Sequence, residues 1–184
     1  AFAVFYVWNG GVAVGDRERQ ALRFNLTNIA CFLLCAWLVF LPQNIAALPR
    51  IRNLLRRPAC IALVLAGFAL YMGVYANDHE FNSSRYRYFL HNEGLYWLTE
   101  YPWIRALAFV PMAWMALTAA VTPLAEPRLR IMYLFAPLAV GLHPLIEQRY
   151  YLPALTLFQV WRSTSGARYE NALLVWYGVA TTWI

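Results

Sequence analysis

The sequence has little charge for its length. Only 13% of its 184 residues are Asp, Glu, Lys or Arg, against about 25% in ordinary soluble domains. Lysine is missing altogether, so all fifteen cations are arginine. A soluble domain of this length would need more polar surface to cover its core. The composition therefore excludes an ordinary soluble domain.

Several common kinds of site are also missing from the sequence. Its three cysteines, Cys31, Cys35 and Cys60, lack the spacing of a metal site, so we expect buried thiols. The sequence shows no nucleotide-binding loop, no catalytic triad and no internal repeat. We therefore expect no metal, no cofactor and no nucleic-acid partner.

Long apolar runs make up much of the sequence. Hydrophobic residues account for 61% of the chain, and runs near the ~17–25 residues that cross a bilayer recur along it. They predict an all-α, polytopic transmembrane protein, with residues 1–184 as a single membrane domain. The expected spans are 1–8, 28–48, 59–76, 105–122, 131–146, 151–161 and 171–184.

Two kinds of irregularity are expected among these spans. The chain begins at Ala1 and stops at Ile184 inside apolar runs, so we expect truncated first and last spans in a fragment of a longer protein. The short spans 131–146 and 151–161 contain Pro137, Pro144 and Pro153. Proline removes a backbone hydrogen bond, so these spans are expected to be kinked, tilted or re-entrant.

Arginine density predicts the orientation. Loops 49–58, 123–130 and 162–170 share one side if the spans alternate, and they hold eight arginines and two acids; the opposite loops hold seven of each. The stretch PRIRNLLRRP, residues 49–58, has four arginines and no acid. Such loops face the cytoplasm. Loops 9–27, 77–104 and 147–150 are then expected on the outer side.

The outer loops carry the candidate functional residues. Loop 77–104 is long, aromatic and charged, which is typical of loops that bind or cover a ligand. Glu147 and Arg149 lie between two proline-bearing spans, close to membrane depth. Charge at that depth is costly and usually faces a partner or a cavity.

Three short blocks resemble one family in order and spacing. They are Asn9-Gly10-Gly11 with Gly15-Asp16-Arg17, then Tyr75-Ala76 with Arg85 and Phe89, and Leu145-Ile146-Glu147-Gln148-Arg149-Tyr150. They are similar to motifs in the C-terminal half of the polyprenyl (dolichyl)-phosphoglucose-dependent alpha-1,2-glucosyltransferases of N-glycosylation. Ser83-Ser84, Tyr86-Arg87 and Gln20 depart from the family pattern. These departures favour a relative from a distant lineage, such as a bacterial one.

The resemblance implies a membrane glycosyltransferase with a C-type fold. It would move a hexose, with glucose expected, from a polyprenyl-phosphate donor to a lipid-linked or surface glycan. The active face would be periplasmic or lumenal, in a bacterial inner membrane or the endoplasmic reticulum, in contact with membrane lipids. Guanidinium groups suit the leaving phosphate. The candidates are Arg85 and Arg149 first, then Arg87, Arg17 and His79, with Glu147 orienting Arg149 or meeting sugar hydroxyls and Asp16 beside Arg17.

The resemblance also implies that the catalytic base is elsewhere. The family's acidic catalytic residue precedes the region that this sequence matches. We therefore expect this chain to contribute residues that bind the substrate and to be catalytically inactive alone. Two other classes stay open. A transporter or lipid flippase would also place charges near proline-broken helices, and a non-catalytic membrane subunit would also be apolar and basic.

Overall fold

The computed structural model describes residues 23–77, 79, 82, 93–143 and 145–181 of the chain. Regular structure in these residues is helical throughout, with a single isolated bridge between Leu124 and Arg162, so the predicted all-α class is confirmed for them. Several predictions lie outside the described residues. They are the span 1–8, most of loop 9–27, and the candidates Asp16, Arg17, Arg85 and Arg87.

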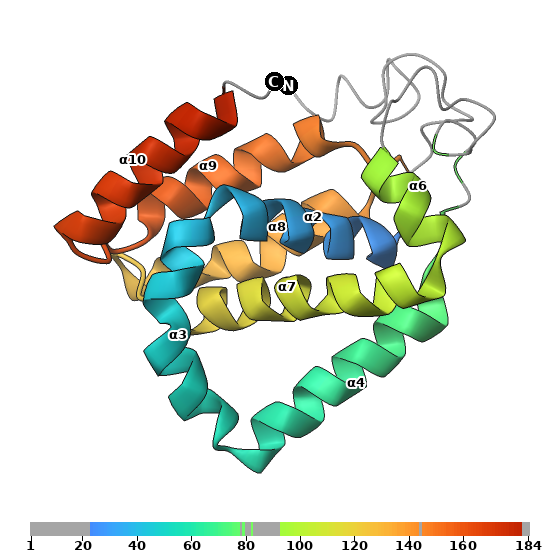
Figure 1. The fold of residues 1–184 in the computed structure, drawn as a ribbon, viewed down its shortest axis with the longest axis horizontal. Helices are drawn as coiled ribbons and strands as arrows, with labels where there is room; N and C mark the ends of the chain where they lie inside the picture. Colours follow the sequence, from blue (N-terminus) through green and yellow to red (C-terminus); the bar gives the residue numbers. More distant parts are fainter. Residues whose placement is uncertain (1–22, 78, 80–81, 83–92, 144, 182–184) are drawn as a thin grey trace, which may run out of the picture.

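The helices form a layered bundle (Figure 1). Helix α2 packs most extensively on α7, and α8 and α9 lie beside them, with α10 against α3. Helix α6 occupies part of the range 77–104, which the sequence analysis treats as a loop. In chain order the elements are α2 (Leu26–Val39), α3 (Leu41–Leu55), α4 (Pro58–Val74), α6 (Glu93–Glu100), α7 (Pro102–Val121), the 3-10 turn η3 (Pro127–Ile131), α8 (Met132–Gly141), the 3-10 turn η4 (Gln148–Tyr151), α9 (Leu152–Trp161) and α10 (Ala167–Thr181).

Local chemistry explains where several helices begin. The side-chain oxygen of Asn25 accepts a hydrogen bond of 2.9 Å from the amide of Thr27, which caps α2. Pro58 and Pro102 open α4 and α7, where the first amide has no helical partner and the fixed φ of proline costs nothing. The same residue type thus starts helices here instead of breaking them.

The predicted span 28–48 is bent. Helices α2 and α3 meet at Phe40 with an angle of 100°. Pro42 has no amide hydrogen, and its ring would clash with the carbonyl of Leu38 in a continuous helix. That carbonyl accepts a hydrogen bond of 2.7 Å from the indole of Trp176 in α10, and Asn44 Nδ2 donates to the carbonyl of Trp37 at 2.9 Å. The side chains satisfy the backbone groups that the break exposes.

The start of α2 approaches the end of α8 closely. A Cβ atom at Gly141 would lie 2.9 Å from Ile29 Cδ1 and 3.1 Å from the ring of Phe24, so only glycine fits without a shift. The amide of Asn25 donates to the carbonyl of Gly141 at 2.6 Å. This contact brings two segments that are more than a hundred residues apart to one end of the bundle.

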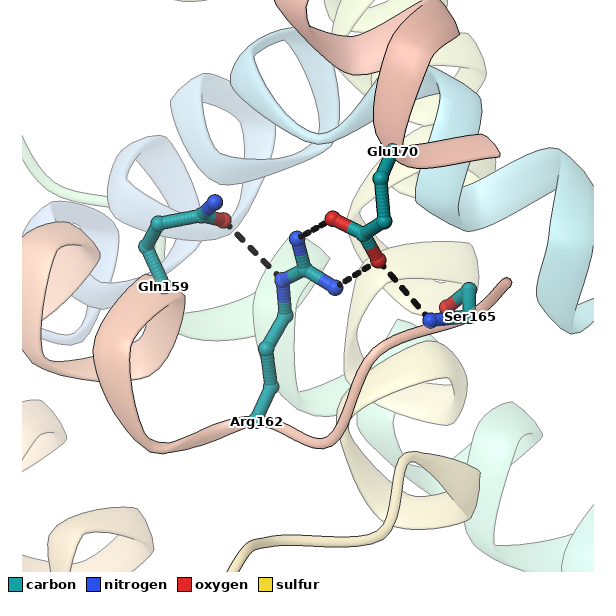
Figure 2. A network of polar contacts seen from close by, with 4 residues as sticks. All are labelled: Gln159, Arg162, Ser165 and Glu170. Carbon is teal, nitrogen blue, oxygen red and sulfur yellow. Dashed lines mark hydrogen bonds and ion pairs between the residues drawn. The ribbon is translucent and has the colours of Figure 1, made fainter. Parts of the chain in front are cut away.

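Polar contacts join α3 and two loops near the C-terminal end of α7. Arg50 donates to the carbonyl of Val121 at 3.3 Å, and Ser163 donates to the carbonyl of Pro123 at 2.8 Å. The neighbouring Arg162 is buried, and Figure 2 shows the polar contacts of its guanidinium. Its Nη1 and Nη2 contact the two carboxylate oxygens of Glu170 at 2.7 and 2.5 Å, and its Nε donates to Gln159 at 3.0 Å. Loops 123–130 and 162–170 therefore meet, whereas Arg50 lies in α3, which continues to Leu55, and contacts the last residue of α7.

One described helix is long and apolar enough to cross a bilayer unbroken, namely α7 with 20 residues. The bent pair α2–α3 passes the same test when taken together, and α4 is apolar but shorter at 17 residues. Large apolar side chains remain exposed on the outside of the bundle, among them Leu63 on α4, Val160 on α9 and Leu174 on α10.

Candidate functional site

The segment between α8 and α9 carries the charged candidates. Helix α8 ends at Gly141, and the backbone at Glu147 is extended, with φ −147° and ψ 129°, before the 3-10 turn η4. The amide of Tyr150 donates to the carbonyl of Glu147 at 3.2 Å, which closes that turn. A break in the helix here leaves a short irregular segment between two apolar helices.

Arg149 and Glu147 form an ion pair. Arg149 Nε lies 2.5 Å from Glu147 Oε1, and the side chains are 68% and 19% exposed. The Glu147 carboxylate raises the pKa of Arg149, so the guanidinium stays charged under all ordinary conditions. The other carboxylate oxygen of Glu147, Oε2, is buried and has no hydrogen-bond partner among the described residues. The pair thus combines an accessible cation with a buried acceptor.

Two other ion pairs show which features of this pair are distinctive. Arg162 is only 2% exposed and both ends of its guanidinium are taken by Glu170, so it has no surface to offer a ligand. Arg128 pairs with Glu126 at the same two-residue spacing, but both are well exposed, at 82% and 51%. Only the Glu147 pair, of these three, joins an exposed arginine to a largely buried carboxylate.

Aromatic rings flank the pair. His143 and Tyr150 stack with centroids 4.8 Å apart and an interplanar angle of 11°. The guanidinium carbon of Arg149 lies 5.5 Å from the centroid of Tyr150. Flat rings beside a cation and a carboxylate are features that a sugar phosphate could use: rings for the pyranose face, the cation for the phosphate.

Asn28 and Tyr151 belong to this region although the sequence analysis did not single them out. Asn28 is fully buried, and its Nδ2 lies 3.0, 2.9 and 3.2 Å from the carbonyl oxygens of Val140, His143 and Leu145. The hydroxyl of Tyr151 donates to Asn28 Oδ1 at 2.5 Å. The sequence offered one signal for Asn28: it is a polar amide side chain within an apolar run. Such side chains often form hydrogen bonds between helices.

A second polar cluster joins the end of α4 to α6 and α7. Arg105 donates to the carbonyls of Leu98 and Thr99 at 2.9 and 2.8 Å, at the C-terminal end of α6, where positive charge is favourable. Its guanidinium carbon lies 3.8 Å from the centroid of Tyr75, whose hydroxyl lies 3.1 Å from Thr99 Oγ1. Asn77 Nδ2 donates to Thr99 Oγ1 at 3.0 Å. This cluster positions the segment after α4.

The structure describes three of the seven predicted site residues. Arg149 and Glu147 come together, and His79 lies in the segment between α4 and α6, where its carbonyl accepts from the amide of Asn82 at 2.9 Å. The described residues contain no group of three His, Cys, Asp or Glu side chains placed to hold a metal ion. Of the three cysteines, Cys31 is buried, as predicted, whereas Cys35 and Cys60 are only partly buried.

Comparison with known proteins identifies the family. The sequence profile of the DIE2/ALG10 family matches residues 1–160, which is most of the chain. The chain belongs to the DIE2/ALG10 family. This confirms the family resemblance in the sequence analysis. The DIE2/ALG10 match includes the Glu147–Arg149 pair and Asn28, whereas α10 lies beyond it.

One similar protein is the Arabidopsis thaliana "Dol-P-Glc:Glc(2)Man(9)GlcNAc(2)-PP-Dol alpha-1,2-glucosyltransferase". It is 27% identical over 187 residues, covering 95% of this chain and 36% of the relative. The chain therefore spans about a third of the length of that curated relative. No solved structure matches the chain.

Proposed function

We propose that this chain forms part of a membrane-embedded glucosyltransferase that takes glucose from a polyprenyl-phosphate donor and transfers it to a lipid-linked oligosaccharide. Membership of the DIE2/ALG10 family and the name of the Arabidopsis relative support this proposal. The observation that carries it is the ion pair at the α8–α9 junction, where an accessible Arg149 is anchored by a largely buried Glu147.

Arg149 would act on the leaving group. In glucosyl transfer the acceptor hydroxyl attacks the anomeric carbon of the donor, a new glycosidic bond forms, and the bond to the phosphate oxygen breaks. The hydroxyl proton passes to a base, which we expect outside the described residues. Negative charge grows on the phosphate as it leaves, and a fixed guanidinium stabilises that charge. Glu147 holds the guanidinium through Nε, Tyr150 also interacts with it, and the exposed part of the side chain would contact the phosphate.

The neighbouring groups would bind the sugar. The stacked rings of His143 and Tyr150 offer a flat apolar face to a pyranose ring. Glu147 Oε2 is buried and has no partner among the described residues, so we expect Glu147 to orient Arg149 rather than to meet a sugar hydroxyl. His79, Arg85, Arg87, Asp16 and Arg17 stay as proposed members of the same outer surface.

The membrane setting is part of the proposal. We place the bundle across the bilayer with 147–150 on the outer, lumenal or periplasmic side and 49–58 in the cytoplasm. The exposed apolar side chains of α4, α9 and α10 support embedding in lipid. A cavity of about 380 Å³ bordered by Ile29, Met115, Tyr133 and Leu155 is almost wholly apolar, which suits part of a prenyl chain better than a polar ligand.

Transfer assays on the protein expressed from its complete gene test this function. Membranes receive dolichyl-phosphoglucose with labelled glucose, or UDP-glucose, and a lipid-linked oligosaccharide acceptor. We expect product from the lipid donor alone and without added metal. Arg149→Gln should lower transfer on the order of a hundredfold, and Arg149→Lys should also be poor because it loses the planar fork.

Arg128→Gln is the matched control, because Arg128 pairs with a glutamate at the same spacing in the segment between α7 and α8. It should transfer glucose at the wild-type rate. Direct use of UDP-glucose would contradict the proposed donor. Movement of the lipid donor across the membrane without a new glycosidic bond would favour a transporter instead.

A further inference from the structure

One buried side chain, that of Asn28, holds the segment that carries Glu147 and Arg149. Asn28 in the first turn of α2 lies within hydrogen-bond distance of three carbonyls, those of Val140, His143 and Leu145. Its amide has two hydrogens, so at least one of them is shared between carbonyls. The last of the three belongs to Leu145, two residues before Glu147.

Tyr151 closes the other side of the segment. Its hydroxyl donates to Asn28 Oδ1 at 2.5 Å and lies 3.3 Å from the Asn28 carbonyl. Its ring, 1% exposed, packs edge-on against Phe32 at 5.5 Å. Leu145 and Tyr151 flank Glu147 and Arg149 in the sequence, so the contacts of Asn28 fix both ends of the stretch between them.

An asparagine at this position has a specific physical advantage. The carbonyls of His143 and Leu145 lie outside any helix, and a buried carbonyl without a donor is costly. Aspartate has nearly the same shape but would turn an oxygen toward these carbonyls in place of a donor. Leucine would leave them without this donor and would leave the Tyr151 hydroxyl only the more distant backbone carbonyl of residue 28. Only the amide both donates to the carbonyls and accepts from Tyr151.

We propose that Asn28 is a positioning residue for the site: with the Tyr151 hydroxyl, it sets the position of the α8–α9 segment and thereby presents Arg149 to the donor phosphate. This inference rests on the proposed function for the role of Arg149. Asn28 touches none of the reacting atoms and acts through the backbone at residues 143 and 145.

The test uses three variants of the protein expressed from its complete gene. Asn28→Asp removes the amide donors, and Tyr151→Phe removes one hydroxyl and keeps the ring. Asn44→Asp is the matched control: Asn44 is equally buried, but its amide donates to the carbonyl of Trp37 at the α2–α3 break. Hydrogen exchange of the amides in 142–150 and the KM for dolichyl-phosphoglucose are measured in each.

We expect Asn28→Asp to speed exchange in 142–150 and to raise the donor KM roughly tenfold, and Tyr151→Phe to raise it roughly threefold. The KM for the acceptor should not change, and Asn44→Asp should leave the donor KM at its wild-type value. If Asn28→Asp does not yield folded protein, Tyr151→Phe decides the question by the same two measurements.

Three results would overturn the proposal: unchanged exchange in 142–150, faster exchange with an unchanged donor KM, or an equal rise in donor KM in the Asn44→Asp control. Failure of the proposed function appears differently. In that case Arg149→Gln transfers glucose normally, while hydrogen exchange still reports whether Asn28 holds the segment.

Discussion

The side-chain oxygen of Thr27 accepts a hydrogen bond of 2.9 Å from the backbone amide of Ala76. Thr27 precedes Asn28, which holds the α8–α9 segment. Two adjacent residues at the start of α2 thus contact two of the three blocks that resemble the family, one at Tyr75-Ala76 and one at residues 145–150. The first turn of α2 is where these distant parts of the sequence are joined.

Thr27→Val should destabilise the protein. Thr27 is 1% exposed, and valine keeps its shape but removes the oxygen, which leaves the Ala76 amide without its acceptor. We expect a loss of about 1–3 kcal/mol in the free energy of unfolding, measured in detergent. Thr27→Ser keeps the oxygen and is the control. Equal stability of the valine and serine variants would show that the hydrogen bond contributes nothing.

A double mutant separates two roles for Arg149. If Arg149 only balances the charge of Glu147, the Glu147→Gln/Arg149→Gln protein should regain most of the activity that either single change removes. If Arg149 binds the donor phosphate, the double mutant should stay as inactive as Arg149→Gln. We expect the second outcome in the transfer assay, with membrane expression measured to control for folding.

Trp176→Phe should weaken the α2–α3 break. The indole of Trp176 donates to the carbonyl of Leu38, the backbone group that Pro42 leaves without a partner. Phenylalanine keeps most of the ring and loses the donor, so we expect a loss of about 1 kcal/mol in unfolding free energy. Trp97→Phe, on the exposed surface of α6, is the control and should change little. Equal effects at both positions would contradict a specific role for the indole.

The ion pair between Arg162 and Glu170 should make the stability of the protein sensitive to acid. The hydrogen bonds of Glu170 to Arg162 hold its pKa below the ordinary glutamate value of 4.5. A lowered folded-state pKa contributes stability that is fully present above that ordinary value and is lost as the pH falls through the folded value. As the pH is lowered below about 4.5, the unfolding free energy of the wild-type protein should therefore decrease. The decrease should be less steep in Glu170→Gln, which lacks the titrating carboxylate. Glu126→Gln removes an exposed pair and should keep the wild-type slope.

The predicted orientation can be tested with single cysteines. In a background with Cys31, Cys35 and Cys60 replaced by alanine, cysteines are placed at the exposed positions Asn53 and Gln148. An impermeant thiol reagent should label position 148 from the lumenal or periplasmic side and position 53 from the cytoplasmic side. Labelling of both from one side would reject the orientation.

Local patterns in the sequence determined the all-α class of the described fold and singled out two residues of the candidate site. Low charge and repeated apolar runs indicate helices, because buried or lipid-facing backbone must satisfy its own hydrogen bonds. Glu147 and Arg149 stood out because two charges between apolar, proline-bearing runs are unusual. Both inferences need only neighbouring residues. The three short blocks added the family, which the profile match confirmed.

Contacts between distant residues were decided by the tertiary structure alone. Pro42 was visible in the sequence, but whether it kinks or breaks a helix depends on partners for the exposed carbonyls. Trp176, which donates to the carbonyl of Leu38, lies 138 residues after Leu38. The two Glu-x-Arg pairs look alike in sequence, and only packing makes Glu147 largely buried and Glu126 exposed. The role of Asn28 depends on carbonyls 112 to 117 residues later. Hydrogen bonds of this kind follow from how helices pack, which no local pattern specifies.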